Sequence, residues 1–198
     1  MAGPTDVTLA TYEAGVERYL AASPTAVTPA VAELLDALVE HLPRGRVLEL
    51  GSGPGREAEY LEQRGLIVDR TDATLGFVER LQRAGHEVRL LDVRSGALGG
   101  PYDALLANAV LLHLERDEME RALRACHAAT RAGGMLALTV KEGDGEAWSD
   151  AKLGAPRWFV YWRPQPLRDA LERAGWKVVR IEQVQGRVEP WLNVLCRR

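Results

Sequence analysis

The stretch Val47–Gly55 combines a short apolar run, an acidic residue and glycines at alternate positions, Gly51, Gly53 and Gly55. The apolar run is typical of a buried parallel strand, and the glycines allow a tight turn that a ligand can approach closely. A helical pattern follows, so the free amide groups at the start of a helix would face that ligand. This arrangement is typical of a nucleotide-binding loop. It differs from the dinucleotide fingerprint G-x-G-x-x-G, because Arg56 stands where the third glycine is required.

Two aspartates stand at the ends of the next two apolar stretches. Asp72 lies 21 residues beyond Gly51, where a carboxylate can accept hydrogen bonds from both ribose hydroxyls of a nucleotide, and Asp69 is an alternative for that role. Asp92 ends the stretch that follows. Taken singly, each aspartate can be explained as a structural acid at a helix start or in a turn. Together with Glu49 they place carboxylates at the carboxyl ends of successive strands, the edge at which open α/β sheets bind ligands.

The order of the apolar stretches predicts the element order from residue 46 onward. Strands are expected at 47–50, 66–68, 87–91, 102–107 and 135–140, with helices between them at 55–64, 74–85 and around 119–126. This alternation predicts a parallel sheet. A helix at 167–174 is followed by apolar stretches at 176–181 and 191–196, which have no helix between them and must pair antiparallel. The predicted fold is therefore α/β and Rossmann-like, with a doubly wound, mainly parallel seven-stranded sheet and an antiparallel C-terminal hairpin.

Two helices are predicted before the first strand. Apolar and tyrosine residues from Leu9 to Tyr19 recur at helical spacing, and Thr28 with the proline after it has the capping pattern of a second helix. We expect residues 1–44 to form a helical lid over a ligand-binding domain at 45–198.

The loop pattern E-x-G-x-G-x-G, the sequence Asp72-Ala73-Thr74 after the second strand, and the C-terminal hairpin resemble class I S-adenosylmethionine-dependent methyltransferases, over about residues 40–198. The resemblance implies S-adenosylmethionine as cofactor, S-adenosylhomocysteine as its product, and no metal. In that family the first acid orders the glycine loop, the second binds ribose, the third meets the adenine amino group, and the end of the fourth strand contacts the methionine part. The cofactor-binding residues expected here are Tyr12, Tyr19, Glu49, Gly51, Gly53, Arg56, Asp72, Ala73, Asp92, Val93, Asn108 and Ala109.

The expected contacts of Arg56 and of the two tyrosines are of a different kind from those of the strand ends. Arg56 is expected to pair with the carboxylate of the cofactor, and a solvent-facing position is the alternative. Tyr12 and Tyr19 belong to the first predicted helix, which would close over the cofactor.

The acceptor is expected beyond the fourth strand and under the segment 141–162. His113 follows two leucines, as in the family stretch that lies under the reaction centre, and is a candidate general base. A structural role in orienting its loop is the favoured alternative. The segment is rich in aromatic residues, so we expect it to cover the substrate, with Lys141, Trp158 and Tyr161 as contacts.

Composition limits the classes of partner. The chain has 25 basic and 28 acidic residues, a net charge of −3, which favours neither a nucleic-acid partner nor a membrane surface. The two cysteines, Cys126 and Cys196, are too few and too far apart for a disulfide framework or a zinc spacing. The acidic run at 142–146 matches no metal-ligand motif. We expect a cytoplasmic protein; the oligomeric state is left open.

The sequence thus predicts transfer of a methyl group from S-adenosylmethionine to a small-molecule acceptor by in-line displacement. One alternative is a protein that binds this cofactor without transferring the methyl group. A nicotinamide-dependent oxidoreductase is less favoured because of Arg56 and the antiparallel hairpin, and a tRNA or protein methyltransferase because of the acidic balance. The acceptor and the atom methylated are left open, because fold and cofactor do not determine them.

Overall fold

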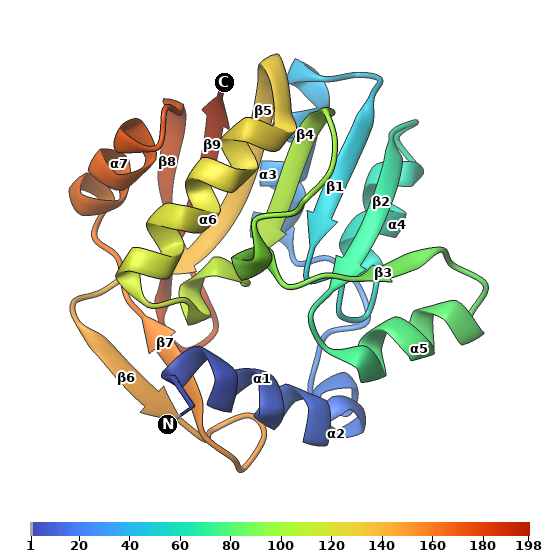
Figure 1. Ribbon diagram of the computed structural model, residues 1–198, viewed down its shortest axis with the longest axis vertical. Coiled ribbons are helices and arrows are strands. Elements are labelled where there is room, and N and C mark those ends of the chain that lie inside the picture. The colour runs from blue at the N-terminus through green and yellow to red at the C-terminus, as the bar shows by residue number, and fades with distance from the viewer. Residues whose placement is uncertain (1) are drawn as a thin grey trace.

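The computed structural model describes residues 2–198. A seven-stranded sheet with the order β3-β2-β1-β4-β5-β9-β8 forms the centre of the molecule (Figure 1). Its strands are β1 Arg46–Leu50, β2 Ile67–Asp72, β3 Val88–Leu90, β4 Tyr102–Asn108, β5 Thr130–Lys141, β8 Lys177–Gln185 and β9 Pro190–Arg197. The pairs from β3 to β5 are parallel, whereas β9 pairs antiparallel with both β5 and β8. The predicted fold is confirmed.

Helices cover both faces of this sheet. They are α3 Pro29–His41, α4 Arg56–Glu62, α5 Leu75–Arg83, α6 Arg116–Ala129 and α7 Pro164–Arg173. Because side chains alternate along a strand, Leu48 and Leu105 pack in the core beneath α6 and α7, while Val47 and Leu106 pack in the core beneath α3 and α4. Burial on both faces explains the consecutive apolar residues Val47–Leu48 in β1 and 104–107 in β4.

The carboxyl edge of the sheet is covered by α1 Pro4–Ala14 and α2 Val16–Ala21. In Figure 1, β1, β2 and β4 point toward these two helices. Helix α3 instead packs on the sheet, with Leu34, Leu35 and Leu38 fully buried. The part of the predicted lid 1–44 that lies over the sheet edge is therefore limited to α1 and α2.

A two-stranded hairpin, β6 Glu146–Ser149 and β7 Arg157–Val160, lies beside α1 (Figure 1). Trp148 and Trp158 face each other across it, with ring centroids 5.1 Å apart. Such cross-strand aromatic pairs stabilise short hairpins. This hairpin, which positions aromatic residues of segment 141–162, was not predicted from the sequence.

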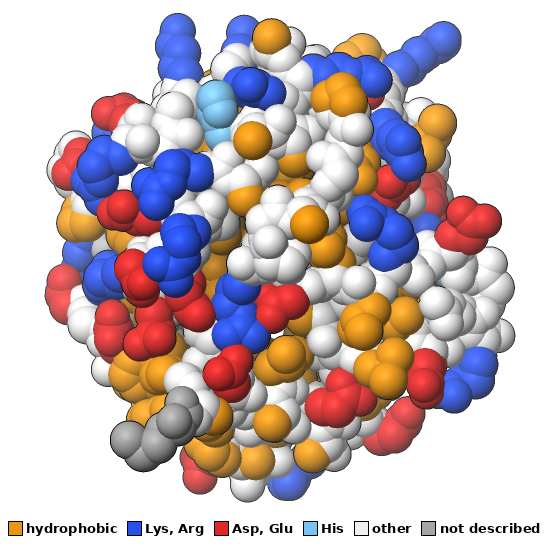
Figure 2. All heavy atoms as spheres, viewed as in Figure 1, with side chains coloured by type: hydrophobic (Ala, Val, Ile, Leu, Met, Phe, Trp, Pro, Cys, Tyr) orange, Lys and Arg blue, Asp and Glu red, His pale blue; other side chains and the backbone are white. Residues whose placement is uncertain are grey.

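Basic and acidic side chains are interspersed on the face seen in Figure 2, so that face carries no extended surface of one sign. Among residues 2–198, no helix is both long and apolar enough to cross a membrane. The described part of the chain also holds no group of three or more histidine, cysteine or acidic side chains placed to bind a metal ion.

Candidate cofactor and acceptor site

A cavity lies where the ends of β1, β2 and β4 meet α1 and α2. The residues predicted for the cofactor that line it are Tyr12, Tyr19, Gly51, Gly53, Asp72, Ala73, Asp92, Val93, Asn108 and Ala109. His113 also lines it. Glu49, Arg56, Lys141, Trp158 and Tyr161 were predicted for the site but do not line this cavity.

The glycine loop forms the floor of the cavity. Gly51 and Gly53 have φ values of 68° and 48°, in the left-handed region that favours glycine. A Cβ on Gly51 would stand 2.5 Å from Val110 Cγ2, whereas a Cβ on Gly53 would meet no atom within 4 Å. Gly51 is therefore required by packing inside the protein, and Gly53 leaves open space on the cavity side.

Asp72 connects the glycine loop to the start of α5. Its Oδ2 accepts from the Gly53 N–H and its Oδ1 from the Thr74 N–H, both at 2.8 Å. Burial raises the pKa of this carboxyl group, and the hydrogen bonds from Thr74 and Gly53 oppose that shift. Each oxygen keeps a further lone pair for a ligand hydroxyl. Asp69 instead forms a bidentate pair with Arg46, at 2.9 and 2.7 Å, and does not line the cavity.

Glu49 lies below the loop, 2% exposed. Its Oε2 has no hydrogen-bond partner among residues 2–198. Burial, followed by the charge of Glu57, raises its pKa to about 8. Burial therefore favours the neutral, protonated form of Glu49 beneath the loop.

The end of β4 is held in an uncommon backbone conformation. Asn108 donates from Nδ2 to Glu57 Oε1 at 2.8 Å and accepts from Thr139 Oγ1 at 2.7 Å. The next residue, Ala109, has a φ of 56° and donates its N–H to the same threonine oxygen at 2.9 Å. Backbone strain of this kind persists where surrounding contacts enforce it, and it clusters at ligand sites.

Asp92 is already engaged by a side chain that the sequence analysis missed. Arg94 donates to it from Nε and Nη2, at 2.9 and 2.6 Å, and from Nη1 to Asp6 on α1 at 2.7 Å. These carboxylates raise the pKa of Arg94, which stays charged. Arg94 also lines the cavity, so it links the predicted adenine side of the site to the lid. The signal available in the sequence was an arginine two residues after the aspartate.

His113 connects three segments around the acceptor side of the cavity. Its Nδ1 lies 2.6 Å from the Trp158 carbonyl oxygen and its Nε2 lies 2.9 Å from Tyr12 Oη. Because a carbonyl oxygen only accepts, the proton is on Nδ1, and Nε2 accepts from the tyrosine hydroxyl. Burial lowers the pKa of His113 to about 3, so the ring is neutral. The same hydroxyl accepts from Arg157 Nη1 at 3.1 Å.

Three buried threonines fix α1 to its neighbours. Thr8 Oγ1 accepts from the Trp158 N–H at 2.8 Å, and Thr11 Oγ1 donates to the Pro156 carbonyl at 2.7 Å. Thr5 Oγ1 lies 2.5 Å from Glu118 Oε2 and 3.1 Å from the His113 carbonyl oxygen, so its single proton is donated to the nearer carboxylate. Their spacing of three places them on one face of the helix. Sequence reasoning followed the apolar residues of this helix and missed its polar face.

Arg56 and Lys141 lie next to the cavity in ion pairs. Arg56 donates to Glu57 Oε1 and to the Pro24 carbonyl, both at 2.9 Å. Lys141 Nζ lies 2.7 Å from Glu189 Oε1 and 3.4 Å from the centroid of the Phe159 ring. Both cations are therefore held by neighbouring residues, and neither side chain lines the cavity.

Comparison with protein families decides what this architecture is. Residues 19–181 match the model of a family described as a methyltransferase domain. The chain belongs to this family. The resemblance to class I S-adenosylmethionine-dependent methyltransferases is thus confirmed for both the family and the fold.

Individual relatives are only distantly similar to this chain. A protein-L-isoaspartate O-methyltransferase of Chlorobaculum parvum is 34% identical over 101 residues, which cover 46% of this chain and 45% of that protein. The match therefore spans less than half of the relative's length. Two solved structures share the fold. A 1,6-didemethyltoxoflavin-N1-methyltransferase of Burkholderia thailandensis, with S-adenosylhomocysteine bound, has a TM-score of 0.76 and 24% identity over 100% of this chain and 91% of that one. The [4+2]-cyclase SpnF has a TM-score of 0.72 and 18% identity over 98% and 95%.

Proposed function

We propose that this protein transfers a methyl group from S-adenosylmethionine to a small-molecule acceptor. The observation that carries the proposal is the cavity itself, which brings the glycine loop, Asp72, Asp92 and the strained end of β4 together beneath α1 and α2. These groups come from four different strand ends, and their order across the sheet matches the order of adenine, ribose and methionine along the cofactor.

Each part of the cofactor has a proposed contact. Asp72 accepts from the ribose hydroxyls with the lone pairs that Gly53 and Thr74 leave free. Asp92 and Val93 hold the adenine end, where the carboxylate already bound by Arg94 is fixed in place. Asn108, Ala109 and Gly51 contact the methionine part. Glu49 supports the glycine loop from below, and Tyr12 and Tyr19 cover the ligand from α1 and α2.

The chemistry needs little from the protein, because the sulfonium group of the cofactor already activates the methyl group. The protein supplies alignment of the acceptor in line with the carbon–sulfur bond and exclusion of water. The Tyr12–His113–Trp158 hydrogen-bond chain holds the lid closed over that geometry. His113 is a weak base in this arrangement, because its pKa is about 3 and Tyr12 occupies Nε2. We therefore propose it as a positioning residue, and the general-base role becomes an outcome of the test described in the Discussion.

The fold also occurs in a [4+2]-cyclase, so a protein that binds the cofactor and catalyses another reaction is the second candidate. Incubation with S-adenosylmethionine and a panel of small acceptors, with mass detection of products, distinguishes the two. A product 14 mass units heavier (one CH₂) than its acceptor, formed together with S-adenosylhomocysteine, is expected. Acceptor conversion that leaves S-adenosylmethionine unconsumed would favour the second candidate.

The remaining proposals concern the surroundings of the enzyme. The balance of 25 basic and 28 acidic residues supports action on a small molecule without a nucleic-acid or membrane partner. We also propose a cytoplasmic location. Lys141, Trp158 and Tyr161 are proposed as acceptor contacts because segment 141–162 is rich in aromatic residues; none of the three lines the cavity, so these contacts require an acceptor that extends beyond it.

A further inference from the structure

Arg157 is a buried cation for which residues 2–198 supply no carboxylate partner. It is the first residue of β7 and is 6% exposed. Its Nη1 donates to Tyr12 Oη at 3.1 Å, and its Nε has no hydrogen-bond partner in residues 2–198. No ion pair in that part of the chain includes it. Burial of an uncompensated charge is costly, so a guanidinium held this way indicates a place for an anion that arrives with a ligand.

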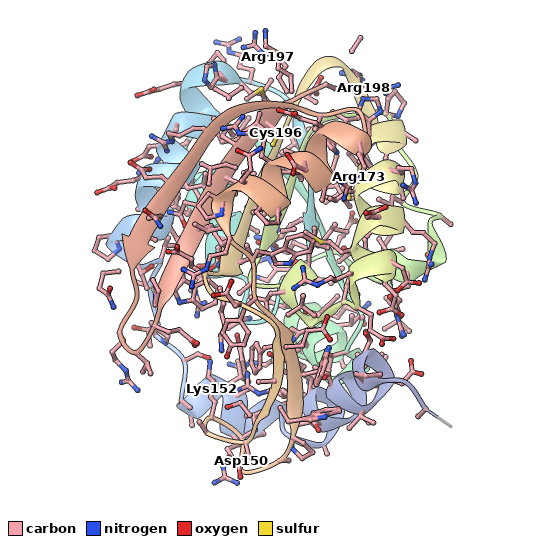
Figure 3. The ribbon with its side chains drawn as sticks, turned by 90° about the vertical axis from the view of Figure 1, so that its left-hand side faces the viewer. Asp150, Lys152, Arg173, Cys196, Arg197 and Arg198 are labelled. Carbon is pink, nitrogen blue, oxygen red and sulfur yellow. The ribbon has the colours of Figure 1, made fainter. Side chains whose placement is uncertain are left out.

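Lys152 is a second cation on the same side of the site. It lies in the loop between β6 and β7, beside the lid helices (Figure 3). Its Nζ donates to Ser23 Oγ at 2.8 Å and lies 3.6 Å from the centroid of the Tyr19 ring. Burial, followed by the charges of Arg157 and Arg56, lowers its pKa to about 8. Among residues 2–198, Lys152 thus contacts a hydroxyl and a ring of the lid and pairs with no carboxylate.

The two cations flank the pair of tyrosines that covers the cavity. Arg157 lies 5.6 Å from the Tyr12 ring, Lys152 lies against Tyr19, and the two rings are 5.4 Å apart. Lys141 adds a third cation, because it and Arg157 lie 3.4 and 5.0 Å from the Phe159 ring. Within residues 2–198 these three cations have a single carboxylate ion-pair partner, Glu189 on Lys141.

The position of this cluster separates it from the nucleoside end of the cavity. Tyr12 and His113 connect it to the end of β4, where the transferable methyl group is proposed to point. Asp92 and Arg94, at the other end, belong to the adenine side. Neither cation lines the cavity itself, but each contacts a tyrosine that does, Arg157 through Tyr12 and Lys152 through Tyr19. A ligand group that met both cations would therefore lie at the tyrosine end of the cavity.

We propose that the acceptor carries an oxyanion, a carboxylate, phosphate or phosphonate, that binds between Arg157 and Lys152 beside the tyrosine pair. The inference rests on the proposed function and names the chemical class of its substrate. The planar guanidinium suits such groups because two of its N–H donors match two oxygens of one anion. Neutral acceptors would leave both cations uncompensated.

The test uses protein saturated with S-adenosylhomocysteine, titrated in a calorimeter with benzoate, with inorganic phosphate and with the neutral benzamide. We expect at least one of the two anions to bind and benzamide not to bind. Arg157→Met should weaken that anion's binding at least tenfold, because a charge-assisted hydrogen bond is lost. Arg157→Lys should retain part of it. Arg121→Gln, a surface arginine paired with Asp117, is the matched control and should bind as the wild type does.

The outcomes separate this inference from the proposed function. If S-adenosylhomocysteine itself does not bind the wild type, the proposed function fails. If it binds normally and neither anion does, or if Arg157→Met binds the anion as well as the wild type, the inference is overturned and the proposed function stands. An Arg157→Met variant that loses S-adenosylhomocysteine affinity at least tenfold and keeps anion binding would assign the arginine to the cofactor carboxylate and also overturn it. If that variant does not fold, Lys152→Gln, on a half-buried loop, must weaken anion binding at least threefold.

Discussion

Replacement of Asp72 by alanine tests how the cavity holds the cofactor. The side chain is 6% exposed and accepts from the Gly53 and Thr74 amides. Its removal takes away the proposed acceptor for two ribose hydroxyls and leaves two backbone donors to find water. Asp69→Ala is the matched control, because Asp69 lies in the same strand, β2, but pairs with Arg46 outside the cavity.

The expected loss of affinity follows from the bonds involved. A hydrogen bond to a charged group contributes about 1.5–3 kcal/mol, and each 1.4 kcal/mol changes a dissociation constant tenfold. Asp72→Ala should therefore weaken binding of S-adenosylhomocysteine by about 10- to 150-fold. The loss of the Gly53 and Thr74 bonds should also lower the free energy of unfolding of the unliganded protein, by about 1–3 kcal/mol.

Two measurements keep these effects apart. Calorimetric titration gives the affinity for S-adenosylhomocysteine, and urea unfolding without ligand gives the stability. Asp69→Ala should change the affinity by less than about twofold. The reasoning is refuted if Asp72→Ala folds and binds S-adenosylhomocysteine as tightly as the wild type, or if Asp69→Ala shows the larger loss.

Four further substitutions test other parts of the site. Gly51→Ala and Gly53→Ala both strain a left-handed backbone, but only a Cβ on Gly51 would meet another atom, Val110 Cγ2 at 2.5 Å. Gly51→Ala should therefore lower the melting temperature further than Gly53→Ala does, whereas Gly53→Ala should fold and bind S-adenosylhomocysteine more weakly than the wild type. A larger fall in melting temperature for Gly53→Ala, or unchanged affinity in that variant, would contradict this. Because the folded pKa of Glu49 is raised to about 8, its stabilising contribution is complete below pH 4.5 and is lost as the pH rises to 8. Urea unfolding at pH 5 and pH 8.5 should therefore show a decline in stability that Glu49→Gln reduces, and the same decline in both proteins would argue against a protonated Glu49. His113→Ala should weaken S-adenosylhomocysteine binding because the lid loses its Tyr12 contact, whereas a hundredfold loss of turnover with unchanged affinity would identify His113 as a general base.

Much of the fold was predictable because its strands are buried on both faces. Val47 and Leu48 pack in different cores, as do Leu106 and Leu105, so consecutive apolar residues mark β1 and β4 in the sequence. The order of strands and helices then fixes a parallel sheet, and the lack of a helix between β8 and β9 fixes the antiparallel pair. The residues at the carboxyl ends, such as Asp72 and Asn108, followed from that order.

What the sequence analysis missed depends on contacts between distant segments. The β6–β7 hairpin is too short for a clear alternation, and it is stabilised by Trp148 against Trp158 and by Thr8 on α1. No local sequence pattern marks Arg157, because what distinguishes it is that it is buried with no ion-pair partner among residues 2–198 and with an unpartnered Nε. Helix α1 was expected to use its apolar face, but it is held through threonine hydroxyls whose partners lie more than a hundred residues away.

The central claim is that the cavity at the carboxyl edge is built for S-adenosylmethionine and its product. Calorimetric titration of the purified protein with S-adenosylhomocysteine, and separately with NAD and NADH, tests it most directly. The account predicts one S-adenosylhomocysteine bound per chain and no heat of binding from either dinucleotide. Binding of a nicotinamide dinucleotide without binding of S-adenosylhomocysteine would contradict it.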